Sequence, residues 1–588
     1  MMPVTKINPD EDTVGRFNRL SASQTNTWNE CPRIWWYQNK LRLKFGQTPP
    51  LFLGRAVEEC VTRVLMESPG IVVKSAPNSV MDSGADNLLP LYDEEIESDI
   101  SEWYNSRIAV YWPPIMQEMH DEWNKNPRKA GNWHDYSMDD YQKMCVTALD
   151  MHLEEVKNLQ DIISDEDLEK WREGETHSIR SPDRRQDSGR HPLARIGSCH
   201  IVEAWEIARP WFVDPDLEQF SQNAIHPEYW FQGEYDLVYR HNSTIKIVDL
   251  KASRGVGDRS GNYVEQLKMY AMLWSKTHDG KIPDALEVWY LGVGKKKKIE
   301  PPNSSEIESM ENSLSDLWTQ IKSEDIQMSE CLPNPSPLRG FSEGGVPTEP
   351  PNSTRCDICE WSNLCPGGQG NDDYNLGTEF QPKGEVKSYQ LTRLENLEPR
   401  ISIFCEVFSI TKNENQPPKI IVAKDGGKAF VKIVSQESEG VLTYEPNLEK
   451  GDMVRLIGVI PSTNWKGEIE LKIDPHARLV KATSEEENDC GLFDFKARWD
   501  LAGRVAYSTY KFGIGKSGKP WVRKGLVLIN DNTKITVEGW DNSWPNIYNT
   551  LQQGDEVAIL NVSLDAWAVD VKANLEKGSS IHVISRFQ

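Results

Sequence analysis

The chain has 588 residues, of which 38% are hydrophobic and 27% are charged, and its formal net charge is −24. A chain of this length is too long for one hydrophobic core and is predicted to form several domains. The acidic balance excludes a protein that coats duplex DNA through its overall charge, but it does not exclude a local basic groove. The first residues lack an apolar signal core and no apolar run is long enough to span a bilayer, which predicts a cytoplasmic protein with no membrane partner.

The first half of the chain is predicted to be mainly helical. Residues 20–68 begin with the N-cap candidates Ser21 and Ser23, and long helical patterns continue over residues 93–175. A polar irregular loop is expected over residues 176–200. Further along, the patterns predict strands over 201–208 (IVEAWEIA), 235–240, 244–251 and 286–293, with a helix over 262–276.

From about residue 386 to the end, the sequence reads as strand and turn, and it contains two copies of one unit. Gly451-Asp452 and Gly554-Asp555 each precede an apolar strand. Trp465 and Trp567 follow these strands at similar distances. An acidic break, TSEEENDCG, separates the copies, so two β-rich domains of one kind are expected.

Two carboxylates and a lysine stand out in the stretch GEYDLVYRHNSTIKIVDLKAS, residues 233–253. Its two strands flank a turn and are predicted to form a hairpin. Asp249 and Lys251 share one face because residues two apart in a strand point the same way, and Asp236 on the partner strand is expected to meet Asp249. Such a group suits Mg²⁺ or Mn²⁺, whereas a solvent-facing hairpin with ordinary charges is the alternative.

This stretch resembles the RecB-type branch of the PD-(D/E)XK nucleases. That family shows a G-x-x-D strand, a [DE]-x-K strand and a Q-x-x-x-Y helix, matched here by Gly233…Asp236, Asp249-Leu250-Lys251 and Gln266…Tyr270. The resemblance implies that Asp236 and Asp249 bind the metal and that Lys251 is catalytic. It also implies that Gln266 and Tyr270 place the DNA strand.

Glu58 stands where the family's upstream G-x-x-x-H helix carries a metal-binding histidine. A carboxylate also binds Mg²⁺, so the resemblance implies Glu58 as a third ligand, and a surface glutamate is the alternative.

Three closely spaced cysteines, Cys356, Cys359 and Cys365, indicate a bound metal in a cytosolic chain. Several RecB-type nucleases hold a structural [4Fe–4S] cluster with three such cysteines and a fourth far upstream, in a C-P-x-x-[WY] context. Cys31 matches that context, so the resemblance implies the same cluster here. Zinc is the alternative, because ligand spacing alone does not separate the two metals.

The second C-terminal copy resembles the OB folds of replication protein A and archaeal single-strand-binding proteins, and the first copy is a weaker match. OB folds bind single strands with stacking aromatics and a basic groove. Each aromatic also has a core alternative, and OB folds bind proteins too. The stacking candidates are Phe430, Trp465, Trp540 and Trp567, and the phosphate-contact candidates are Lys466, Lys516, Lys519, Arg523 and Lys524.

The expected fold is an α/β restriction-endonuclease-like core with a large helical insertion, followed by two all-β OB barrels. The expected limits are 20–366 for the nuclease domain with its insertion at about 90–200, 367–385 for a linker, 386–484 for the first OB fold and 493–588 for the second.

A phosphate loop around Lys516 is excluded because Tyr510 replaces the required glycine, so no ATP is expected. The run Lys295–Lys298 is predicted to be a solvated turn, and contact with the DNA backbone is the alternative.

The predicted function is a metal-dependent DNA nuclease, a single-strand exonuclease of DNA repair, recombination or replication, with a helicase or recombination partner. The alternative is a non-catalytic or partner-dependent single-strand-binding subunit of a helicase–nuclease or CRISPR-adaptation complex.

Overall fold

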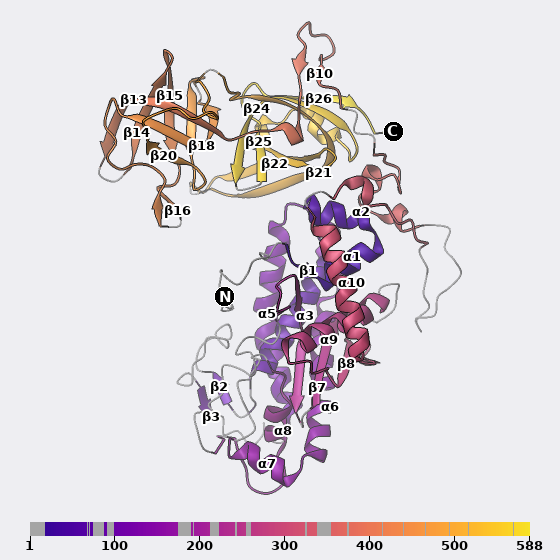
Figure 1. Ribbon diagram of the computed structural model, residues 1–588. Coiled ribbons are helices and arrows are strands. Elements are labelled where there is room, and N and C mark those ends of the chain that lie inside the picture. The colour runs from indigo at the N-terminus through magenta and orange to yellow at the C-terminus, as the bar shows by residue number, and fades with distance from the viewer. Residues whose placement is uncertain are drawn as a thin grey trace. The chain divides into compact units, whose positions relative to one another are not determined.

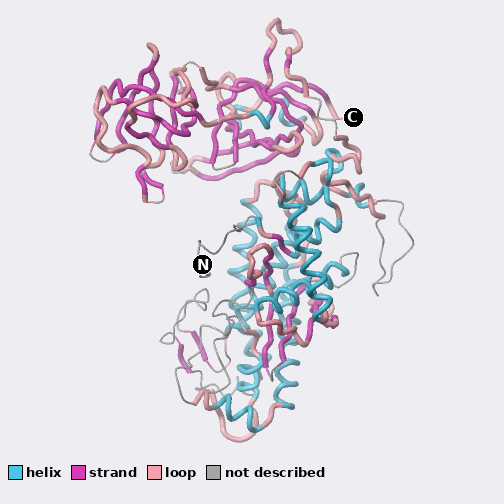
Figure 2. The backbone as a smooth tube through the Cα atoms, viewed as in Figure 1, coloured by secondary structure: helices cyan, strands magenta, loops and turns pink. Residues whose placement is uncertain are grey.

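The computed structural model describes residues 18–587 except 68, 70, 74–87, 91–98, 175–189, 192, 212–222, 242–243, 254–259, 324–325, 338–353, 373–375, 414–415, 439, 465, 493, 516 and 568–569. The chain divides into two compact units. The first comprises Met1–Trp35 and Gly46–Arg355, and the second comprises Trp36–Phe45 and Cys356–Gln588. Helices dominate the first unit and strands the second (Figure 2).

The N-terminal segment is helical, as predicted. Helix α1 (Ala22–Glu30) begins after Ser21, whose side chain accepts a hydrogen bond from the backbone N–H of Gln24 at 3.3 Å. Helix α2 (Pro32–Trp35) continues into a π-helical turn, η2 (Trp36–Lys40). Helix α3 (Pro49–Met66) follows and buries one face.

A helical bundle surrounds α3. It contains α5 (Ile100–Lys125), α6 (Met138–Ile162), α7 (Asp165–Arg172) and α8 (Ile201–Ala208), and α3 contacts both α5 and α6 (Figure 1). The predicted strand at residues 201–208 is wrong, because this segment is helix α8. His200 and Glu203 form a capping box at its start, and seven of its eight residues are buried, which hides the helical period.

The first unit also contains a four-stranded sheet in the order β6-β7-β8-β9. Strands β6 (Leu237–His241) and β7 (Thr244–Lys251) are antiparallel. Strand β8 (Ala285–Tyr290) is parallel to β7, and helix α9 (Ser260–Thr277) makes the crossover between them. The predicted turn at Lys295–Lys298 is wrong, because these residues belong to the edge strand β9 (Lys295–Ile299), which is antiparallel to β8.

The second unit contains two barrels with the same strand order. The first runs β13-β14-β15-β19-β18 and closes through β13–β18, and the second runs β21-β22-β23-β25-β24 and closes through β21–β24. Strand β15 is parallel to β19 in the first barrel, and β23 is parallel to β25 in the second. This order and closure make both barrels OB folds, so the predicted fold class is confirmed, whereas the exact domain limits stay predictions.

The strands of the first barrel are β13 (Ile401–Asn413), β14 (Gln416–Lys424), β15 (Gly427–Ile433), β18 (Met453–Thr463), β19 (Ile469–Ile473) and β20 (Arg478–Lys481). Those of the second are β21 (Trp499–Ile514), β22 (Pro520–Ile529), β23 (Lys534–Trp540), β24 (Glu556–Trp567), β25 (Asp570–Asn574) and β26 (Ser580–Ser585). The two barrels touch where Lys472 Nζ lies 2.6 Å from Asp565 Oδ1.

The remaining strands are short: β1 (Leu20–Ser21), β2 (Ile71–Val73), β3 (Leu88–Pro90), β4 (Asn223–Ile225), β5 (Phe231–Glu234), β10 (Glu379–Phe380), β11 (Tyr389–Gln390), β12 (Thr392–Arg393), β16 (Glu437–Ser438) and β17 (Val441–Leu442). The other helices are α10 (Ser304–Lys322) and the 3₁₀ turns η5 (Trp133–Asp135), η6 (Met328–Glu330), η7 (Arg355–Ile358), η8 (Ser362–Leu364), η9 (Leu394–Asn396), η10 (Asp541–Ser543) and η11 (Asn546–Thr550). Within the described part of the chain, every helix is too short or too polar to cross a bilayer.

Candidate functional site

The β6–β7 hairpin brings two carboxylates together. Leu237 pairs with Val248, so the preceding Asp236 lies opposite Asp249. Asp236 Oδ2 accepts a hydrogen bond from the backbone N–H of Leu250 at 2.6 Å, and Asp249 is only 2% exposed. The hairpin therefore brings Asp236, just before β6, opposite Asp249 of β7 at one end of the sheet.

Lys251 offsets part of the negative charge of this pair. Its Nζ lies 2.8 Å from Asp249 Oδ1 and 2.7 Å from Oδ2. Burial alone lowers the pKa of Lys251, but attraction by Asp249 and Asp236 outweighs it, so the pKa is raised and the ammonium stays charged. A fixed cation beside two carboxylates is suited to stabilise negative charge that develops on a phosphate.

Glu58 of α3 joins the same electrostatic cluster. Part of its side chain is exposed, yet crowding by protein atoms, followed by repulsion from Asp236 and Glu234, raises its pKa to about 8. Burial, followed by repulsion from Asp236, raises the pKa of Asp249 to about 7, against the attraction of Lys251. Burial also raises the pKa of Asp236. These carboxylates repel one another, and a divalent cation would relieve that repulsion.

Glu234 was missed from the sequence, although a signal was available. It stands two residues before Asp236, and residues at that spacing share one face of an extended chain. Among the described residues, no three His, Cys, Asp or Glu side chains gather closely enough to hold a metal ion in this conformation. The cluster is therefore defined by the contacts of Lys251 and the mutual repulsion of its carboxylates.

Helix α9 presents three side chains toward the hairpin. Gln266 Nε2 donates a hydrogen bond to the hydroxyl of Tyr270 at 2.8 Å, so the predicted shared face exists. Tyr263, one turn earlier on that face, was missed, and the Lys251 Nζ lies 5.0 Å from the centroid of its ring. Gly233 packs closely here, because a Cβ at this position would lie 3.1 Å from the Tyr270 ring and 3.0 Å from Leu273, so that these side chains would have to shift.

The cysteines predicted to bind a cluster fall in both units. Cys356, Cys359 and Cys365 lie on two successive tight turns, with Cys359 N–H donating to Cys356 O at 3.2 Å. Gly370 closes these turns, since a Cβ there would lie 2.4 Å from the backbone nitrogen of Cys365. Cys31 belongs to the first unit, where it ends helix α1 and its Sγ accepts the N–H of Asn334 at 3.4 Å.

The second barrel carries an exposed aromatic surface on β22 and β23. Trp540 is 55% exposed, and the Arg523 guanidinium lies 5.8 Å from its ring centroid. Trp521, which was missed, packs edge-on against Trp540 with centroids 6.3 Å apart. Gly513 seats that ring, because a Cβ there would lie 2.7 Å from Trp521. These rings and the guanidinium form the aromatic platform, Trp521, Arg523 and Trp540.

The other predicted nucleic-acid contacts are scattered. Lys524 follows Arg523 and points to the opposite face, where it lies 2.7 Å from Asp541 and 5.2 Å from the Tyr548 ring centroid, so it is not part of the platform. Lys519 is exposed near the tip of the β21–β22 hairpin, Lys466 is exposed in a turn, and Phe430 is half-buried on β15. Trp465, Lys516 and the Trp567 side chain lie outside the described residues.

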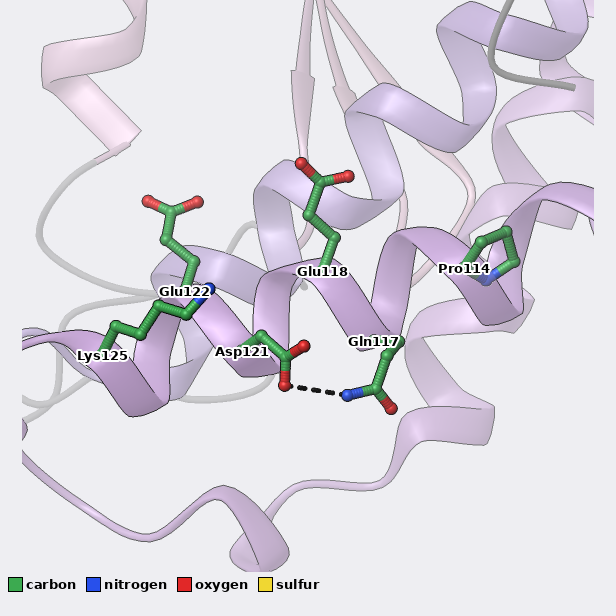
Figure 3. Close-up of a pocket in the computed structure, with 6 residues that line it drawn as sticks. All are labelled: Pro114, Gln117, Glu118, Asp121, Glu122 and Lys125. Carbon is green, nitrogen blue, oxygen red and sulfur yellow. Dashed lines mark hydrogen bonds between the residues drawn. The ribbon is translucent and has the colours of Figure 1, made fainter. Parts of the chain in front are cut away.

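A surface hollow of about 530 Å³ lies along α5 (Figure 3). Gln117 donates a hydrogen bond to Asp121 Oδ1 at 2.9 Å, and Glu122 pairs with Arg55 of α3 at 3.0 Å. Its lining holds three carboxylates and one lysine. This excess of negative charge repels a phosphodiester backbone, so the hollow does not suit the binding of nucleic acid. The lining residues are Pro114, Gln117, Glu118, Asp121, Glu122 and Lys125.

Comparison with known proteins gives one family and several OB-fold structures. The model of the PD-(D/E)XK nuclease superfamily matches residues 19–366. No curated protein matches the sequence.

The similar solved structures are distant from this chain. A replication protein A heterotrimer bound to single-stranded DNA is 12% identical with a TM-score of 0.14, over 32% of this chain and 51% of that one, so this chain spans about half of its length. The replication factor A related protein from Methanobacterium thermoautotrophicum is 16% identical with a TM-score of 0.14, over 16% and 89%. Fission yeast Pot1 with single-stranded DNA is 9% identical with a TM-score of 0.13, over 36% and 92%.

Proposed function

The chain belongs to the PD-(D/E)XK nuclease superfamily, and we propose that it is a metal-dependent DNA nuclease that trims single-stranded DNA from an end. The carrying observation is the cluster of Asp236, Asp249 and Lys251 on one hairpin, with Glu58 adding a third carboxylate to it. Superfamily membership supports a phosphodiesterase, and the cluster supplies residues of the types that this chemistry requires.

Asp236, Asp249 and Glu58 are proposed to hold Mg²⁺ or Mn²⁺. Their fit rests on the chemistry of the donor set, because carboxylate oxygens suit a hard cation. The proposal requires the three side chains to draw closer together when the ion binds, since they do not form a metal site in this conformation. When bound, the ion polarises the scissile phosphodiester and lowers the pKa of a water molecule.

The surrounding side chains position and stabilise the reacting phosphate. The Lys251 ammonium stabilises the charge that develops around phosphorus, and its contact with Asp249 keeps it at the site. Gln266 fixes the hydroxyl of Tyr270 through a 2.8 Å hydrogen bond, so that both side chains hold the strand in one orientation.

The barrels are proposed to capture the single strand. The aromatic platform supports this role, because the exposed ring of Trp540, beside a guanidinium, can stack on bases of any sequence while the cation attracts phosphates. Binding by the barrels would keep the strand attached between successive cuts. Such an activity fits DNA repair, recombination or replication, with a helicase or recombination partner that supplies single strands.

Cys31, Cys356, Cys359 and Cys365 are proposed to hold a structural [4Fe–4S] cluster. The donor set supports it, because four thiols are the ligands that such a cluster takes, although zinc takes the same set. Anaerobically purified protein is expected to contain about four iron atoms and four sulfides per chain, and Cys359→Ser is expected to lose them. Stoichiometric zinc without iron would contradict the iron–sulfur assignment.

The test of the nuclease is a time course on end-labelled single-stranded and duplex DNA with Mn²⁺ or Mg²⁺. Wild type is compared with Asp249→Asn, Lys251→Met and a control, Lys281→Met, which removes an exposed charge from the loop between α9 and β8. Cutting by wild type and the control, lost in the first two variants, is the expected result, and the product ladder gives the polarity.

A second candidate is a non-catalytic or partner-dependent single-strand-binding subunit. Glu58 in place of a histidine favours it, because the usual imidazole ligand is absent from that position. Tight single-strand binding by wild type without cutting, in either metal, would replace the nuclease proposal with this one.

A further inference from the structure

The segment Trp36–Phe45 belongs to the same compact unit as the barrels, although it lies far from them in sequence. Beyond the π-helical turn η2, Leu41 and Leu43 are buried at 3% and 2% exposure, whereas Arg42 and Lys44 are exposed. Buried leucines and exposed cations therefore alternate over residues 41–44. The side chains of both cations are therefore accessible to solvent.

Two hydrogen bonds tie this segment to the second barrel. Lys534 Nζ, at the start of β23, donates to the backbone carbonyl of Arg42 at 2.9 Å. The backbone N–H of Lys44 donates to the hydroxyl of Tyr507 on β21 at 3.2 Å. Arg42 has φ 52°, in the left-handed region that side chains other than glycine seldom adopt, and the bond from Lys534 holds its carbonyl there.

The result is a local group of cations on a chain of net charge −24. Burial, then the nearby Arg42 and Lys44, lower the pKa of Lys534 against the opposing pull of Asp570. A backbone phosphate placed among these cations would be attracted by all three of them. Phe45, which follows Lys44 in the chain, leaves 44% of its surface exposed, so the segment also offers an accessible aromatic ring.

These groups lie on the sheet face that carries the aromatic platform. Ile535 and Val537 of β23 point into the barrel core, so Lys534 and Trp540 share the outer face. They are six residues apart on one strand, which is roughly 20 Å at the usual rise per residue. The cations and Phe45 therefore stand at one end of this face and the platform at the other.

We propose that Arg42, Lys44, Phe45 and Lys534 form a second contact for single-stranded DNA, the junction contact. Its cations bind consecutive backbone phosphates and its ring stacks on a base, so that one strand reaches from the platform to the segment before helix α3. This inference rests on the proposed capture of single strands by the barrels, and it assigns to that capture residues outside the OB folds.

The experiment measures binding of a fluorescein-labelled oligothymidylate to the full chain, in EDTA to prevent cutting, over a range of salt concentrations. Each phosphate contact to a single strand contributes about 0.7 to the slope of log K against log salt. Arg42→Gln/Lys44→Gln is therefore expected to lower the slope by about 1.4. The matched control Lys143→Gln/Lys170→Gln removes two ion-paired surface charges from helices α6 and α7 and is expected to leave the slope unchanged.

Two further variants keep the test decisive. Phe45→Ala is expected to weaken binding at least about fivefold with the slope unchanged, since it removes stacking and no charge. If the double variant unfolds at a lower temperature than wild type, Lys44→Gln alone is used, with an expected slope change of about 0.7.

A slope and affinity equal to wild type in the Arg42, Lys44 and Phe45 variants, while Trp540→Ala weakens binding, would overturn the junction contact and leave the proposed function intact. Wild type that fails to bind the oligonucleotide would overturn both.

Discussion

The carboxylate hairpin and the outer face of the second barrel differ in the interactions on which they depend. At the hairpin, acids are crowded together, and the pKa values of Asp249 and Glu58 rise to about 7 and about 8. On the barrel, Trp540 is exposed and a guanidinium lies over its ring. Crowded charges make a site that depends on every member, whereas a stacking surface adds affinity one contact at a time.

The largest expected effect separates these two regions. Lys251→Met is expected to lower the single-turnover cleavage rate by about 10²- to 10³-fold, because it removes a preorganised charge that acts on the transition state. Affinity for single-stranded DNA, measured by anisotropy in EDTA, is expected to stay within about twofold of wild type. A matching loss of affinity would show that the two regions are not separate.

Trp540→Ala is expected to do the reverse. Losing one stacked base costs about 1–3 kcal/mol, or roughly 5- to 150-fold in affinity. The rate of cutting at saturating enzyme is expected to remain that of wild type, and quench-flow measurement at several enzyme concentrations checks this. An unchanged affinity would remove the platform from the binding surface.

Competition between protons and the metal ion for the carboxylates is expected to give an effect of intermediate size. The acids must lose their protons to bind a divalent ion, so Mn²⁺ affinity is expected to rise at least about tenfold between pH 6 and 8, measured by calorimetry with Asp249→Asn as the control. Single-strand affinity in EDTA is expected to change far less over the same range. A flat Mn²⁺ affinity would contradict the raised pKa values.

The same shift has a consequence for metal-free stability. The folded-state pKa of Asp249, about 7, lies above its ordinary value of 3.8, so the folded chain retains a proton that the unfolded chain loses. This stabilising contribution is complete below pH 3.8 and is lost as the pH rises to about 7. Asp249→Asn is therefore expected to gain thermal stability relative to wild type across that window, measured by calorimetry in EDTA. Equal pH profiles of the two proteins would oppose this expectation.

The smallest effect concerns Tyr263. A ring beneath an ammonium contributes about 0.5–1 kcal/mol, so Tyr263→Ala is expected to slow cleavage roughly two- to fivefold. Tyr263→Phe keeps the ring and is expected to cleave at the wild-type rate. A slow Phe variant would instead assign the role to the hydroxyl.

The sequence predicted those features that depend on local spacing. The strand period placed Asp249 and Lys251 on one face, and the helical period placed Gln266 beside Tyr270. The repeated Gly-Asp and strand pattern predicted two β-rich domains of one kind, and the resemblance to replication protein A identified them as OB folds. The wrong strand at residues 201–208 arose because a helix buried on nearly all sides has no readable period.

The missed residues depend on tertiary contacts instead. Tyr263 becomes notable only because the ammonium of Lys251 lies over its ring, and Trp521 because it meets Trp540 across neighbouring strands. Arg42 and Lys44 lie near Lys534 only after the chain has folded. Spacing along the chain carries no signal for such pairs.

The most direct test of the central claim starts from a complex of wild-type protein and end-labelled single-stranded DNA formed in EDTA, to which excess Mn²⁺ is then added. The account predicts a burst of cleaved product from wild type and none from Lys251→Met bound to the same DNA. DNA that stays intact in the wild-type complex, with the metal bound, would contradict it.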